Sequence, residues 1–197
     1  MLTATYSTFI GFLRYGFHFS ICLSLFMSVS TAQVPEKVPA VGDKAPEFRL
    51  PNLQGEPVQL SALVAKGPVV LVVLRGFPGY QCPACNAQTG QLLAAAEKFA
   101  ARKAQVVLVY PGSDAELKQK AERFVGDKIL PANFHLVVDN QYLLTYLYGL
   151  RLDAPNETAY PSTFIVDSKG KIVFAKISKS HGDRAATEEI LKSLPTP

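Results

Sequence analysis

The sequence predicts an α/β domain with a central mixed β-sheet, helices on both faces of that sheet, and an N-terminal β-hairpin. Three observations lead to this fold class. Segments rich in Val and Leu at 69–74, 106–110 and 134–138 alternate with segments of helical periodicity. Two further apolar segments, 162–167 and 171–174, flank a Ser-Lys-Gly turn. Of the 197 residues, 48% are hydrophobic and 18% are charged, so the chain can bury a packed core.

The first elements frame the strand that we expect at the centre of the sheet. Segments 48–50 and 58–60 flank a turn that ends at Gly55, which predicts a small hairpin. A short helix is expected over 61–67, and Pro68 separates it from the next strand. The unbroken run 69–74 has no polar face, which is typical of a strand covered on both sides.

The remaining elements follow in strict alternation until the final hairpin. The pattern predicts a helix at 83–101, a strand at 106–110, a helix at 114–125, a strand at 134–138, a helix at 141–148, the hairpin strands 162–167 and 171–174, and a last helix at 184–194. Strands that alternate with helices favour a mixed sheet with helices on both of its faces.

The N-terminal segment 1–32 differs from the rest of the chain. It has no acidic residue and one basic residue, Arg14, ahead of the apolar run 17–29, and it closes on small residues up to Ala32. This pattern predicts a secretory signal peptide that is cleaved after Ala32. We therefore divide the chain into a signal peptide at 1–32, a linker at 33–40 and a domain at 41–197.

Two alternatives for this segment stay open at the level of sequence. An uncleaved helix over residues 9–29 is nearly long enough to anchor the protein in a bilayer. Translation from Met27 would remove the apolar run and leave the domain in the cytosol. The cleaved signal peptide and the uncleaved anchor both predict an exported protein, periplasmic or secreted. Such a protein contacts a membrane only if the N-terminal segment is retained.

The charge distribution bears on the partners. The net charge is +4, and Lys and Arg form no continuous stripe. Nucleic acid is therefore not an expected partner.

The chemistry is carried by a cysteine pair. The chain has three cysteines, Cys22, Cys82 and Cys85, and the pair 82–85 stands where the loop after the central strand becomes a helix. Pro83 suits the first helical turn, and the helix N-terminus stabilises a thiolate. A spacing of three residues places Cys85 one turn deeper on the same side. We expect Cys82 to attack its substrate and Cys85 to resolve the mixed disulfide.

A structural or metal-binding role is the alternative for the pair. Zinc requires about four ligands, and beyond the two thiols the sequence offers His135 and His181. A carrier of copper or zinc that uses the thiolates with one histidine is therefore kept as a third hypothesis. No bound cofactor is expected.

Several motifs together resemble a known family. They are the opening stretch 41–50, the strand that leads into Cys82-Pro83-Ala84-Cys85, and the block 160–167, which reads Tyr-Pro-Ser-Thr-Phe-Ile-Val-Asp. Residues 41–197 resemble the thioredoxin superfamily in its alkyl hydroperoxide reductase/thiol-specific antioxidant branch, the redoxins, which include the peroxiredoxins. The resemblance implies a thioredoxin-like fold with redox-active cysteines.

The same resemblance implies a substrate-docking surface. Pro161 matches the cis-proline of the family, which faces the cysteine pair and binds substrate backbone. We therefore expect Pro161, Tyr160 and Phe77 to form this surface. From sequence alone, an ordinary proline at a strand edge is the alternative for Pro161.

The chain departs from the peroxiredoxin pattern Pro-x-x-x-Thr-x-x-Cys. Pro78 and Cys85 match its ends, but Cys82 replaces the threonine. Tyr160-Pro161 also stands where peroxiredoxins carry an arginine. Arg75 is a candidate replacement for that cation, against the simpler expectation of a solvated loop residue.

These residues predict an oxidoreductase that acts on thiols and disulfides. The main hypothesis is thiol–disulfide exchange in an exported compartment, with protein or small-molecule thiols and disulfides as substrates and a reducing or oxidising redox partner. The alternative is a peroxiredoxin-like antioxidant enzyme that reduces hydroperoxides.

Overall fold

The computed structural model describes residues 1, 37–75 and 81–195. All the elements discussed below belong to the unit Gln33–Pro197. Apart from Met1, the expected signal peptide and anchor lie outside the described residues, as do residues 33–36 of the expected linker, so cleavage and export stay predictions. Among the described residues, no helix combines the length and the apolar character needed to cross a bilayer.

A five-stranded mixed sheet forms the centre of the domain, as the sequence predicts. Its order is β5-β4-β3-β6-β7. The strands β3, β4 and β5 are parallel, whereas β6 runs antiparallel to both β3 and β7. Their bounds are β3 Val69–Val73, β4 Gln105–Gly112, β5 Phe134–Asn140, β6 Ser162–Val166 and β7 Ile172–Ile177.

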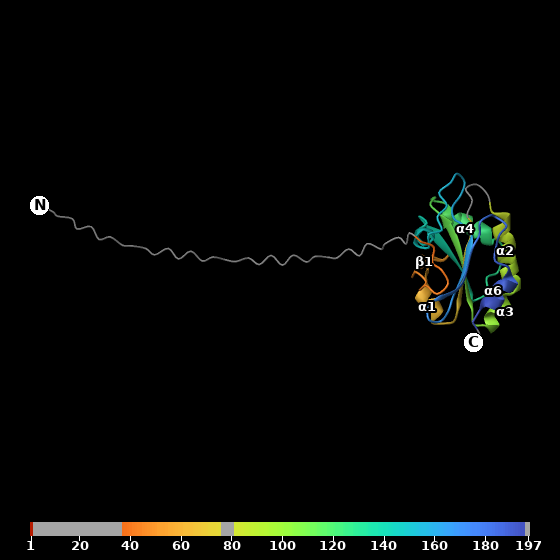
Figure 1. The fold of residues 1–197 in the computed structure, drawn as a ribbon. Coiled ribbons are helices and arrows are strands. Elements are labelled where there is room, and N and C mark those ends of the chain that lie inside the picture. Colours follow the sequence, from red (N-terminus) through yellow and green to blue (C-terminus); the bar gives the residue numbers. More distant parts are fainter. Residues whose placement is uncertain (2–36, 76–80, 196–197) are drawn as a thin grey trace. The chain divides into compact units, whose positions relative to one another are not determined.

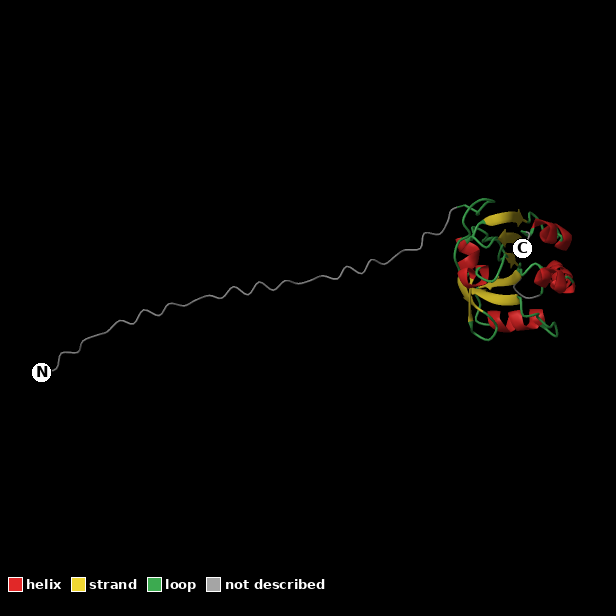
Figure 2. Ribbon diagram, turned by 90° about the horizontal axis from the view of Figure 1, so that it is seen from below, coloured by secondary structure: helices red, strands yellow, loops and turns green. Residues whose placement is uncertain are grey.

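Helices cover both faces of this sheet (Figures 1 and 2). The side chains of β3 alternate between two cores, Val70 and Val72 in one and Leu71 and Val73 in the other. The first core is closed by α2 Pro83–Ala94, α3 Ala96–Ala101, α4 Leu117–Val125 and α6 Thr187–Ser193. The second is closed by α1 Leu60–Val64, α5 Leu143–Leu147 and the hairpin of β1 Arg49–Pro51 and β2 Pro57–Gln59.

Strand β3 is fully buried along its length. It pairs on one edge with β4 and on the other with β6, and both of its faces are covered. The prediction of a central strand at this position is confirmed. Arg75, just beyond its carboxyl end, contacts the Cys85 sulfur, so the buried central strand positions the site.

The observed bounds of every helix differ from the predicted ones, and two of these differences have a clear local cause. The helix expected over 83–101 is divided at Ala95, whose backbone (φ −101°, ψ 13°) leaves helical geometry and donates to the carbonyl of Leu92 at 3.1 Å. The tighter turn separates α2 from α3. The helix expected from 114 begins at Leu117, because the Asp114 carboxylate accepts from the Glu116 N–H at 2.9 Å and holds a turn ahead of the helix.

Candidate active site

Cys82 stands at the N-cap of α2, with Pro83 at the first helical position. Its own backbone is extended (φ −64°, ψ 117°), and its carbonyl accepts from the Asn86 N–H at 3.1 Å. Proline costs nothing at this position because the first N–H groups of a helix have no partner within the helix. The Cys82 sulfur therefore lies at the positive end of the α2 dipole.

The residue before Cys82 is held from two sides. The Tyr110 hydroxyl of β4 donates to the Gln81 side-chain oxygen at 3.0 Å, and the Gln81 amide nitrogen donates to the Lys120 carbonyl of α4 at 2.9 Å. Gln81 is polar and half-buried, so these bonds replace water for both ends of its amide. They fix the entry of the chain into the cysteine motif.

Cys85 lies one turn further along α2, and its side chain is 1% exposed. Its sulfur accepts the backbone N–H of Arg75 at 3.2 Å and lies 3.4 Å from the carbonyl oxygen of the same residue. The end of the central strand thus contacts the inner thiol directly. The prediction that Cys85 is the deeper cysteine of the pair is confirmed.

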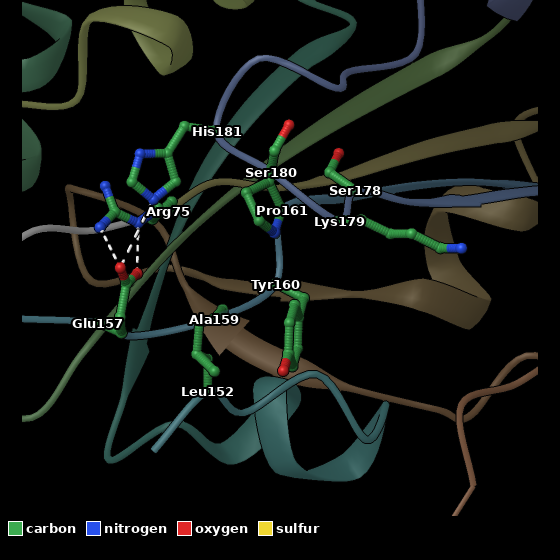
Figure 3. A pocket seen from close by; sticks show the side chains of 10 residues that line it. All are labelled: Arg75, Leu152, Glu157, Ala159, Tyr160, Pro161, Ser178, Lys179, Ser180 and His181. Carbon is green, nitrogen blue, oxygen red and sulfur yellow. Dashed lines mark hydrogen bonds and ion pairs between the residues drawn. The ribbon is translucent and has the colours of Figure 1, made fainter. Parts of the chain in front are cut away.

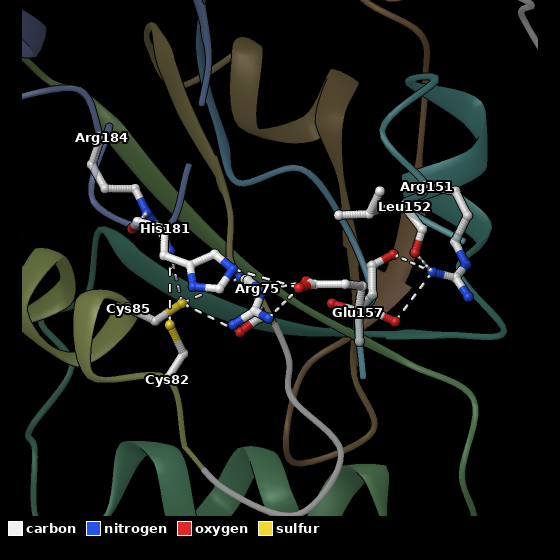
Figure 4. A network of polar contacts seen from close by, with 9 residues as sticks. Arg75, Cys82, Cys85, Arg151, Leu152, Glu157, His181 and Arg184 are labelled. Carbon is white, nitrogen blue, oxygen red and sulfur yellow. Dashed lines mark hydrogen bonds and ion pairs between the residues drawn. The ribbon is translucent and has the colours of Figure 1, made fainter. Parts of the chain in front are cut away.

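A guanidinium group lies beside both sulfurs. The Arg184 Nη2 is 3.4 Å from the Cys85 sulfur and 3.9 Å from the Cys82 sulfur (Figure 4). Two further bonds orient it: Nε donates to the His181 carbonyl at 2.9 Å, and Nη1 donates to the Gln88 side chain at 3.1 Å. The segment ahead of α6 therefore delivers a cation to the cysteines.

These surroundings ionise the two thiols unequally. A hydrogen bond from the Cys85 thiol, together with the backbone N–H groups of Cys85 and Ala84 and the charge of Arg184, lowers the pKa of Cys82 to about 5 despite its burial. The same hydrogen bond to Cys82, followed by burial, raises the pKa of Cys85. A single S–H cannot serve two acceptors, and an ionised Cys82 is a better acceptor than the Arg75 carbonyl. The surroundings therefore favour a thiolate at Cys82 and a thiol at Cys85.

Arg75 is buried, with 2% of its surface exposed, so the expectation of a solvated loop residue is wrong. Its guanidinium pairs through Nε and Nη2 with the two carboxylate oxygens of Glu157. A buried guanidinium needs such a charge partner because desolvation is otherwise too costly. This bidentate pair also lowers the pKa of Glu157.

The predicted docking residues Pro161 and Tyr160 line one small pocket of about 90 Å³, which Figure 3 shows with Arg75, Glu157 and His181 on its wall. Neither cysteine is among the lining residues. The docking role of Pro161 and Tyr160 stays a prediction. Phe77, the third docking residue, lies outside the described residues.

The prediction of a cis peptide bond before Pro161 is wrong. The described part of the chain contains no cis peptide bond, so the bond between Tyr160 and Pro161 is trans. The Tyr160 N–H donates to the Leu150 carbonyl at 2.8 Å, and the Pro161 carbonyl accepts from the Ser178 N–H at 2.8 Å. These two bonds keep the chain extended as it enters β6, where a trans bond is the default.

The described residues contain no group of three His, Cys, Asp or Glu side chains able to hold a metal ion. His135 of β5 hydrogen-bonds to Gln105 at 3.1 Å, and the His181 Nε2 lies 3.5 Å from a Glu157 oxygen. Each of the two histidines considered for a thiolate metal carrier therefore has a partner other than the cysteines.

Two residues of this site were absent from the sequence-based prediction. Arg184 and Glu157 carry no motif of their own and lie far from the cysteines along the chain. Arg184 could have been inferred from topology, because the last helix of such a fold packs on the same sheet face as the cysteine helix. Glu157 gives no comparable signal.

The unequal ionisation predicts which thiol reacts first. Their exposures, 4% for Cys82 and 1% for Cys85, differ too little to decide the order, so the thiolate decides it. In a Cys22→Ser background, brief treatment of the reduced protein with iodoacetamide should label Cys82. The labelling rate should rise through pH 5, where Cys82 loses its proton, and change little above about pH 6. Mass mapping that finds Cys85 labelled first would contradict the assignment.

Comparison with known proteins places the chain among thiol-dependent enzymes. It is 28% identical over 148 residues to "Putative peroxiredoxin bcp" of Buchnera aphidicola, which covers 71% of this chain and 87% of that protein. It is 28% identical over 132 residues to "Thiol-disulfide oxidoreductase ResA" of Bacillus subtilis, covering 67% of this chain and 64% of ResA.

A similar solved structure belongs to the same class of proteins as these relatives. Peroxidoxin BcpB of Mycobacterium tuberculosis superposes with a TM-score of 0.62 at 25% identity, covering 79% of this chain and 96% of that one. The fold is therefore thioredoxin-like, as the sequence predicts. The family model described as AhpC/TSA family matches residues 41–175, a span that includes both cysteines and Pro161. The chain belongs to the AhpC/TSA family and is a thiol-based oxidoreductase.

Proposed function

We propose that this protein is a thiol peroxidase, in which Cys82 reduces a hydroperoxide and Cys85 resolves the product. The observation that carries the proposal is the Arg184 guanidinium beside both sulfurs, at 3.9 Å from Cys82 and 3.4 Å from Cys85. The sequence favoured disulfide exchange because the family's threonine and arginine are replaced. Arg184 supplies the missing cation from another part of the chain.

The first step uses the Cys82 thiolate. It attacks the terminal oxygen of a hydroperoxide, so an S–O bond forms as the O–O bond breaks, and Cys82 becomes a sulfenic acid. The departing alkoxide gains negative charge, and hydrogen-bond donors placed where charge develops are the largest contribution to many such reactions. Arg184 is the donor in reach, and the Cys85 thiol supplies the proton that turns the alkoxide into an alcohol.

The second step closes the pair. The Cys85 thiolate attacks the Cys82 sulfur, an S–S bond forms, and hydroxide leaves and takes a proton from solvent to become water. Two electrons from a reducing thiol partner then return the disulfide to the dithiol by exchange through a mixed disulfide. The partner is thus a thiol or dithiol, protein or small molecule.

Thiol–disulfide exchange remains the second candidate. It is supported by the spacing of the two cysteines at the start of α2 and by the likeness to ResA. Most of the curated relatives found are named peroxiredoxins, which supports the peroxidase instead.

The two candidates differ in which oxidant the reduced protein consumes faster. We expect a stopped-flow trace with hydrogen peroxide to outpace oxidation by a mixed-disulfide substrate by orders of magnitude in the same preparation. The reverse order would make disulfide exchange the function. Titration of the reduced protein with Zn²⁺ or Cu⁺ separates the metal-carrier hypothesis, which requires tight stoichiometric binding.

A further inference from the structure

Glu157 lies between two parts of the site without being one of its reacting groups. It precedes β6, and in Figure 4 Arg75 stands between it and the cysteines. Its carboxylate grips Arg75 through two bonds, and one of its oxygens lies 3.5 Å from His181. The Glu157 side chain is 17% exposed and that of Arg75 is 1% exposed, so water competes little for this pair.

The first connection runs through Arg75. Its guanidinium is fixed by Glu157, while its backbone N–H and carbonyl both face the Cys85 sulfur, at 3.2 and 3.4 Å. Fixing the guanidinium limits the side-chain rotamers of Arg75 and therefore the backbone positions from which it can reach Glu157. Glu157 therefore restrains the backbone groups that hold Cys85.

The second connection runs through His181. One side of this residue contacts Glu157, and its carbonyl accepts from the Arg184 Nε at 2.9 Å. Arg184 then reaches both sulfurs. The Glu157 carboxylate thus binds Arg75 directly and contacts His181, the residue whose carbonyl binds Arg184.

We infer that Glu157 is a positioning residue of the thiol site, which holds Arg75 against Cys85 and steadies the segment that presents Arg184 to both sulfurs. The inference deepens the proposed function, because a misplaced Arg184 would serve neither the thiolate nor the departing oxygen. It concerns the geometry of the dithiol itself, so it can be tested without any hydroperoxide.

Charge alone and positioning make opposite predictions for the Cys82 thiol. A carboxylate disfavours a nearby thiolate by Coulomb repulsion, so removing its charge without moving anything lowers the pKa of Cys82. If Glu157 steadies the segment that presents Arg184, its loss weakens a contact that favours the Cys82 thiolate, and the pKa of Cys82 rises. The sign of the shift therefore separates the two roles.

The experiment is a pH titration of thiolate absorbance near 240 nm on the reduced full-length protein in a Cys22→Ser background. In Glu157→Gln, the amide oxygen can still accept one of the two Arg75 bonds, but the N–H₂ faces the other donor, so the two-point clamp and its charge are lost. We expect the pKa of Cys82 to rise by about one unit, which lowers the thiolate fraction at pH 5 by roughly fivefold. Asp153→Asn is the matched control, since Asp153 is 92% exposed and pairs only with the nearby Arg151 among the ion pairs described.

A second variant covers the case in which Glu157→Gln does not fold. Glu157→Asp keeps the charge but shortens the side chain, so it cannot span the same two bonds, and positioning still predicts a higher pKa for Cys82. An unchanged or lowered pKa in a folded variant of either kind would overturn the inference. A protein that titrates as expected but consumes no peroxide would instead count against the proposed function alone.

Discussion

Replacing Cys82 with Ser is expected to abolish both peroxide consumption and disulfide exchange, because a hydroxyl cannot supply the thiolate that Cys82 provides with its pKa of about 5. Replacing Cys85 with Ser should give a different defect. Cys82 still reacts once with the oxidant, and the reaction then stops for want of the resolving thiol.

The two variants are compared in single-turnover assays without a reductant and in multiple-turnover assays with a thiol reductant, because an added thiol itself consumes a sulfenic acid. Cys85→Ser should accumulate one sulfenic acid per chain, which dimedone traps on Cys82, whereas Cys82→Ser should trap none. Cys22→Ser serves as the matched control and should turn over normally. Full single-turnover activity in Cys82→Ser would assign the attacking role to Cys85.

Replacing Arg184 with Met is expected to slow peroxide reduction by about 10²–10³-fold, the usual cost of losing one preorganised donor to a developing oxyanion. Met keeps an unbranched apolar chain but removes the bonds to both sulfurs and to Gln88. The variant also loses part of the charge that lowers the pKa of Cys82, so its thiolate should form at higher pH.

The pH profile divides the two contributions. A thiol that ionises at pH 6 instead of 5 is still mostly thiolate at pH 7, so a loss of rate at pH 7 reports the missing donor and an added loss near pH 5 reports ionisation. Arg184→Lys keeps the positive charge but not the planar guanidinium, so its rate of peroxide reduction should lie between those of the wild type and Arg184→Met. Wild-type rates for Arg184→Met at pH 7 would remove Arg184 from the chemistry.

The fold followed from local patterns. The runs 69–74, 106–110 and 134–138 have the composition of buried strands, and the structure places all three side by side in one sheet. Cys82 and Cys85 were predictable for the same reason, because a strand, a loop and a proline-led helix are neighbours in the chain.

The groups that tune the thiols were not local. Arg184 lies 102 residues beyond Cys82 in the chain and reaches the site from the segment before α6. Glu157 lies 75 residues beyond Cys82 (157 − 82) and reaches the site from the loop before β6. The burial of Arg75 was missed because its partner Glu157 is distant in the sequence. The cis peptide bond before Pro161 was expected only from the family resemblance. In this chain the peptide bond is trans, and the backbone hydrogen bonds of Tyr160 and Pro161 fit that geometry.

The shared guanidinium also bears on how readily the pair gives up its electrons. The Cys85 hydrogen bond, the backbone N–H groups of α2 and the Arg184 cation together stabilise the reduced form, which has a thiolate, and none of them favours a neutral disulfide. With the pKa of Cys82 at about 5, the reduced form at pH 7 is favoured by about a hundredfold over one with an unperturbed thiol. For a two-electron couple that is roughly 60 mV. The disulfide of this protein should therefore be easier to reduce than its two-residue spacing alone would suggest, and a mild thiol donor suffices to recycle it.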